Sequence, residues 1–86
     1  MSTSPEPAPT ARPEDDVVSA LSHWLAFHLG NDDLRVRLRA IGTIGLAREQ
    51  ADAVEELLTE LESAPDGQRG GLEMLVPETL EAVALG

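Results

Sequence analysis

Two histidines, His23 and His28, have the side chains with the most versatile chemistry in this 86-residue chain. An imidazole can bind a transition metal, or transfer a proton near neutral pH. The two residues are five positions apart, which places them about 140° apart around a helix, on different faces. They are therefore not expected to chelate one ion. The sequence has no HExxH motif and no cluster of histidines and carboxylates, so it predicts no metal site.

The other patterns associated with catalysis are also weak. Ser19 and His23 are four positions apart and could touch on a helix, but no acid is placed to orient the imidazole. The glycines of GTIG and RGG match no phosphate-binding loop, and no acidic spacing matches a calcium loop. We therefore expect no catalytic residue, no cofactor and no enzymatic activity.

His28 has two interpretations. It falls among Leu21, Trp24 and Leu25 on the apolar stripe expected for the first helix. A histidine near a helix C-terminus is favoured by the helix dipole, which is the simpler reading. The alternative is a role as a ligand, a catalytic group or a pH sensor.

Charge is unevenly distributed along the chain, whose formal net charge is -10. Residues 32–48 contain four arginines and two aspartates, whereas residues 49–86 contain ten acids and one arginine. Arg35 and Arg39 would share one side of a helix, and they are predicted to be internal counter-charges for the acidic helix that follows. This negative total argues against a nucleic-acid partner.

A partner surface is expected where acids and aromatic residues are exposed. The acids of the run from Glu49 to Glu62 fall on one side of a helix without any lysine, and Trp is common in binding hot spots. The predicted partner-binding residues are Trp24, Phe27, His28, Glu49, Asp52, Glu56 and Glu60. The expected partner is another protein, basic in charge or a subunit of an enzyme.

The elements that would position these residues are helices. Residues 14–29 form an amphipathic pattern with Gly30 as its stop, and residues 45–63 form the clearest helix, with a leucine-rich stripe from Leu46 to Leu61. Pro77 is expected in the first turn of a short last helix.

Residues 34–41 fit two patterns. A strand places Leu34, Val36, Leu38 and Ala40 on one side, whereas a helix aligns Leu34, Leu38 and Ile41. Asn31 as an N-cap and Gly42 as a stop favour the helix. The segment Leu72 to Val76 could likewise be helix or strand.

The predicted fold is an all-α bundle of three to four helices, with an α/β fold containing a strand at 34–41 as the alternative. Residues 1–13 hold four of the six prolines and are expected to be a disordered tail, and residues 14–86 form one domain. Because about seventy residues build only a small core, a homodimer is expected, with the Leu46–Leu61 stripe as core or dimer seam.

The sequence thus predicts a small acidic interaction or regulatory module, such as an accessory subunit, an adaptor or an antitoxin-like inhibitor. It would bind its partner through the acidic helix and an apolar face containing Trp24. The alternative is a small subunit that adds structure or a site residue to a larger enzyme. No signal segment precedes the first helix and no apolar run is long enough to span a membrane, so a cytoplasmic protein is expected.

Overall fold

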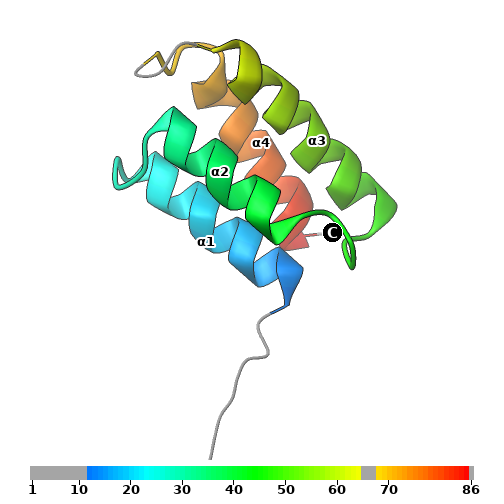
Figure 1. Ribbon diagram of the computed structural model, residues 1–86. Coiled ribbons are helices and arrows are strands. Elements are labelled where there is room, and N and C mark those ends of the chain that lie inside the picture. Colours follow the sequence, from blue (N-terminus) through cyan, green and yellow to red (C-terminus); the bar gives the residue numbers. More distant parts are fainter. Residues whose placement is uncertain (1–11, 65–67, 86) are drawn as a thin grey trace, which may run out of the picture.

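The computed structural model describes residues 12–64 and 68–85, which form a bundle of four α-helices (Figure 1). The helices are α1 (Pro13–Leu25), α2 (Asn31–Ile41), α3 (Arg48–Ser63) and α4 (Leu72–Leu85). Successive helices run in opposite directions, and each packs against two neighbours: α1 and α3 both contact α2 and α4. The described residues contain no strand, so the all-α prediction is confirmed.

The first helix begins one residue earlier than expected. Pro13 is its first residue and the acids Glu14, Asp15 and Asp16 occupy its first turn, where the helix dipole favours negative charge. Pro13 therefore belongs to the folded domain. The rest of the expected tail, apart from Arg12, lies outside the described residues.

The first helix also ends earlier than expected, at Leu25, and not near Gly30. The amide of Phe27 donates to the Trp24 carbonyl at 3.0 Å, and the amide of His28 donates to the His23 carbonyl at 2.8 Å. These two bonds form a Schellman motif, in which Phe27 takes the left-handed position with φ 65°. Glycine normally occupies this position, and a side chain there costs roughly 1–2 kcal/mol.

Residues 34–41 are helical, so the alternative with a strand is wrong. Leu34 and Leu38 are buried, whereas Val36, the residue that did not fit the helical pattern, is 56% exposed. Gly42 ends the helix with φ 75°. Asn31 is not the N-cap: Gly30 holds that position, and Asn31 is the first helical residue, with its side chain buried.

The last helix is longer than predicted, since it begins at Leu72 and contains Pro77 in its interior. The segment Leu72 to Val76 is therefore helical. Proline lacks the N–H that would donate to the carbonyl of Glu73. Glu73 is an exposed residue, so water can reach that part of the helix.

A single chain forms the complete hydrophobic core. Val54, Leu57 and Leu61 of the α3 stripe are almost completely buried inside the bundle. The stripe is therefore core and is not available as a dimer seam. The other buried apolar residues come from all four helices: Val17, Ala20, Leu21, Trp24, Leu34, Leu38, Leu72, Val76 and Val83.

The buried side-chain amide of Gln50 links the start of α3 to the end of α4. The Gln50 side chain accepts a hydrogen bond from the Ala47 amide at 2.9 Å and donates to the Val83 carbonyl at 3.1 Å. It therefore satisfies one backbone group at the start of α3 and another near the end of α4, both of which the helices leave unpaired.

Candidate functional site

Trp24 is buried, so the prediction that it lies on a partner-binding face is wrong. Its ring is fully enclosed in the core, and its indole Nε1 donates to Oδ1 of Asn31 at 2.8 Å. Nδ2 of Asn31 donates in turn to the Gln68 carbonyl at 2.6 Å. The apolar stripe containing Trp24 faces the neighbouring helices, and the indole N–H is satisfied inside the protein.

Arg69 is the residue that the sequence interpretation missed at this end of the bundle. Its guanidinium carbon lies 3.9 Å from the centre of a Trp24 ring and 4.3 Å from that of Phe27. Its Nη1 donates to the Trp24 carbonyl at 2.6 Å and its Nη2 to the Leu29 carbonyl at 2.8 Å. Arg69 therefore ties the connection between α3 and α4 to the turn between α1 and α2.

Phe27 and His28 are exposed on the turn between α1 and α2. Phe27 is 74% exposed, and the ring centroids of His28 and His23 are 6.1 Å apart. Helix α1 does not pack against α3, which carries the other predicted partner-binding residues. Phe27 and His28 therefore do not lie on a helix that packs against α3, and the predicted partner-binding residues are not brought together on two neighbouring helices.

The predicted acids of α3 are all exposed, and most of them border a groove between α3 and α4. Glu56 and Glu60 line a hollow with Met74, Leu75 and Glu78. Glu49 lines a second hollow with Glu78, Glu81, Ala82 and Leu85. Glu78 lines both hollows, and we call the two hollows together the acidic groove. Asp52 is exposed on the same side of α3, between Glu49 and Glu56.

Most of the lining of the acidic groove comes from α4, which the sequence interpretation did not assign to a site. Met74 is 74% exposed and Leu85 is 80% exposed, and Glu78 and Glu81 lie between them in the sequence. The spacing of Met74, Glu78, Glu81 and Leu85 follows one helical face, and this was the signal available. It was missed because the last helix was expected to begin at Pro77.

Among the described residues, no ion pair involves a carboxylate of the acidic groove. In residues 12–64 and 68–85, the ion pairs join Arg12 to Asp15, Arg35 to Asp32, and Arg39 to Glu62. None of these acids lines the groove. Acids spaced four apart on α3, such as Glu56 and Glu60, therefore repel each other without a neutralising partner.

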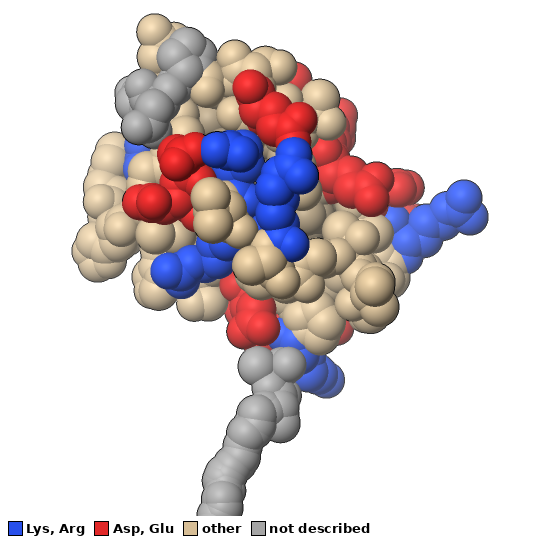
Figure 2. All heavy atoms as spheres, in the orientation of Figure 1, with Lys and Arg blue, Asp and Glu red and all other residues tan. Residues whose placement is uncertain are grey.

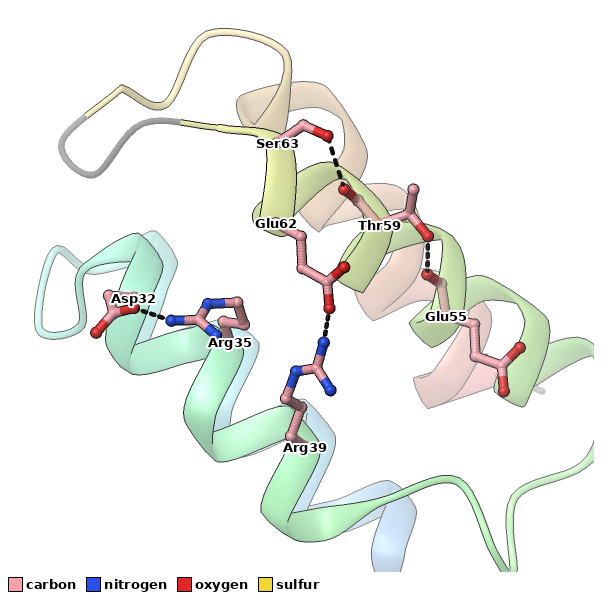
Figure 3. Close-up of polar contacts among 7 residues, drawn as sticks. All are labelled: Asp32, Arg35, Arg39, Glu55, Thr59, Glu62 and Ser63. Carbon is pink, nitrogen blue, oxygen red and sulfur yellow. Dashed lines mark hydrogen bonds and ion pairs between the residues drawn. The ribbon is translucent and has the colours of Figure 1, made fainter.

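The arginines of α2 lie elsewhere, on a face where positive and negative side chains alternate (Figure 2). Arg39 reaches Glu62 near the end of α3, whereas Arg35 pairs with Asp32 within its own helix (Figure 3). Arg35 lines a hollow with Leu61 and Glu62 of α3, but unlike the prediction its ion pair is with Asp32 and not with an acid of α3. Arg37 is exposed and borders a different hollow, with Asp33 and Val36.

Comparison with known proteins adds no relative: no family model matches the chain, and neither a curated protein nor a solved structure is significantly similar to it. Among the described residues, none of the helices has the length and apolar character needed to cross a membrane. The same residues contain no group of three or more histidines, cysteines and acids able to hold a metal ion.

Proposed function

We propose that this protein is a non-enzymatic interaction module, such as an accessory subunit, adaptor or inhibitor, that binds a basic protein through the acidic groove. One observation supports this function above the others. Carboxylates from both α3 and α4 share the acidic groove with the exposed side chains of Met74 and Leu85 and the half-buried Leu75, and none of the ion pairs among the described residues involves these carboxylates.

Such a surface is costly for a chain that acts alone. Exposed apolar side chains reduce solubility and unpaired like charges reduce stability, whereas a partner that carries both cations and apolar side chains relieves both. Protein interfaces commonly combine apolar and charged side chains in this way. The chemistry of the groove therefore favours a cationic, amphipathic segment as its occupant.

A second copy of the same chain is a poorer occupant for this groove. Each chain carries a formal net charge of -10, so two chains repel each other as they approach. A basic partner is instead attracted over a distance of about 8–10 Å at physiological salt. This attraction raises the association rate more than the final affinity.

A synthetic peptide provides a direct test. The distance along α4 from Met74 to Leu85 is about 16 Å, so a helical peptide of about 16 residues covers the groove. It should carry leucines on one face, flanked by lysines. Calorimetry with the full chain should show binding. The double variant Glu56→Gln/Glu78→Gln should weaken it about five- to tenfold, because each exposed ion pair contributes up to about 1 kcal/mol.

The matched control is Glu55→Gln/Glu73→Gln, which removes the same charge from the same two helices but outside the groove lining. It should change the affinity by no more than about twofold, because distant exposed charges are screened by salt. A scrambled peptide of identical composition should bind more weakly than the amphipathic one. If both double variants lost the same affinity, or if both peptides bound equally well, the protein would recognise only total charge. Either result would refute the proposal that the partner binds in the acidic groove.

A further inference from the structure

The early end of α1 brings two histidines together that an uninterrupted helix would separate. His23 is the third residue from the end of the helix, and His28 follows Phe27 in the Schellman motif. This motif folds the chain back, so that the residue after the left-handed position lies over the last helical turn. The ring centroids of His23 and His28 are consequently 6.1 Å apart, with the ring planes tilted by 39°.

This separation is a little longer than that of two imidazoles bound to one ion. A transition metal lies about 2.0–2.1 Å from a histidine nitrogen, which places each ring centre about 3 Å from the ion. At the ligand angles of octahedral or tetrahedral sites, two ligating rings therefore have centres about 4–5 Å apart, so the two imidazoles must approach each other on binding. Both side chains are exposed, so small rotations of the rings need no rearrangement of the core.

We propose that His23 and His28 form a two-histidine binding site for a divalent transition metal ion such as Zn²⁺, Ni²⁺ or Cu²⁺. Imidazole nitrogen favours these ions, whereas Mg²⁺ and Ca²⁺ prefer oxygen ligands. The described residues offer no third ligand, so water fills the remaining positions in the isolated chain. The site is independent of the acidic groove, which lies on α3 and α4.

Nearby charges have opposing effects on the binding of a cation by His23 and His28. The guanidinium of Arg69 is bonded to the carbonyl of Leu29, the residue after His28, and its positive charge opposes a bound cation. The formal net charge of -10 attracts cations to the protein as a whole. The exposed acids could also collect metal ions, and the test must separate them from the histidine pair.

The test is an NMR titration of the isotopically labelled full chain with Zn²⁺, in which the imidazole and backbone signals are followed together. Both imidazoles should shift with one common saturation curve, and the amides that shift first should belong to the turn between α1 and α2. Different saturation curves for the two rings would overturn the site. Earlier changes at acidic residues would also overturn it.

Two variants make the test specific. His28→Asn should weaken Zn²⁺ binding at His23 by roughly tenfold or more, because loss of even an outer hydrogen-bonding partner weakens metal binding about 10- to 100-fold. The double variant Ser22→His/His23→Asn keeps two histidines but moves one by a third of a helical turn. It should bind as weakly as the single variant. Wild-type affinity in either variant would contradict a shared ion.

Discussion

The guanidinium of Arg69 lies over Trp24, with its carbon 3.9 Å from a ring centre, and one of its nitrogens donates to the carbonyl of the same residue. One side chain therefore satisfies the end of α1 and covers the largest core residue. A second nitrogen bonds the Leu29 carbonyl, so the guanidinium spans the whole turn between α1 and α2. This relationship holds together the end of the bundle that carries Phe27 and the two histidines.

Replacing Arg69 should therefore destabilise the fold clearly. Arg69→Ala removes two hydrogen bonds from a charged donor and two cation–π contacts, and we expect a loss of about 2 kcal/mol in the free energy of unfolding. Urea denaturation followed by circular dichroism measures this loss. Arg48→Ala is the matched control, because Arg48 is exposed at the start of α3. If both substitutions lowered the free energy of unfolding by a similarly small amount, Arg69 would not stabilise the turn between α1 and α2.

The left-handed conformation of Phe27 predicts an unusual order of stability among variants. Phe27→Ala loses the contact with Arg69 and keeps the backbone strain, whereas Phe27→Gly loses the contact and relieves the strain. The glycine variant should therefore be more stable than the alanine variant by about 1 kcal/mol. In an ordinary helix the order is reversed, since glycine is destabilising there. An alanine variant that is the more stable of the two in thermal unfolding would contradict the Schellman motif.

The core position of Leu57 gives a prediction about assembly. Leu57→Asp places a charge inside one chain's bundle, where burial of an unpaired carboxylate is strongly unfavourable. We expect the variant to lose helical circular dichroism altogether. If the α3 stripe were a seam between two copies, sedimentation would instead show a folded monomer. The exposed residue Thr59 on the same helix provides the control, and Thr59→Asp should remain folded.

Much of the fold could be predicted from the sequence, because the apolar residues of α1, α2 and α3 repeat at helical spacing. The helix over residues 31–41 was favoured over a strand by Asn31 as an N-cap and Gly42 as a stop; Gly42 does end the helix, whereas the N-cap is Gly30. The end of α1 could not be predicted in this way. Gly30 looked like the stop, whereas the chain turns at Phe27, a residue that rarely takes the left-handed conformation.

The site was less predictable, because its members come from separate helices. The acids of α3 were recognisable as an exposed face, but Glu78, Glu81 and Leu85 join them only through the packing of α3 against α4. The burial of Trp24 and the contacts of Arg69 also depend on how the helices pack together. A single arginine in an acidic half was visible in the sequence, but its contact with Trp24, 45 positions away, was not.

The pair between Arg39 and Glu62 should contribute to specificity more than to stability. Both side chains are about half exposed, and such pairs are worth about 0–1 kcal/mol. A double-mutant cycle with Arg39→Gln and Glu62→Gln should give a coupling energy in that range, and the coupling should decrease at high salt. Arg37→Gln with Glu62→Gln is the control pair and should show no coupling. Equal coupling in both pairs would contradict a specific contact between Arg39 and Glu62.

The central claim is that the acidic groove is the partner-binding surface, and the most direct measurement is to map where the lysine–leucine peptide binds. Two-dimensional NMR of the labelled chain during titration reports each backbone amide separately. We expect the largest shifts at residues 49–60 and 71–85, with the same set of residues affected at low and at moderate salt. Shifts concentrated on α1 or α2, or spread evenly over all exposed acids, would contradict the proposed function.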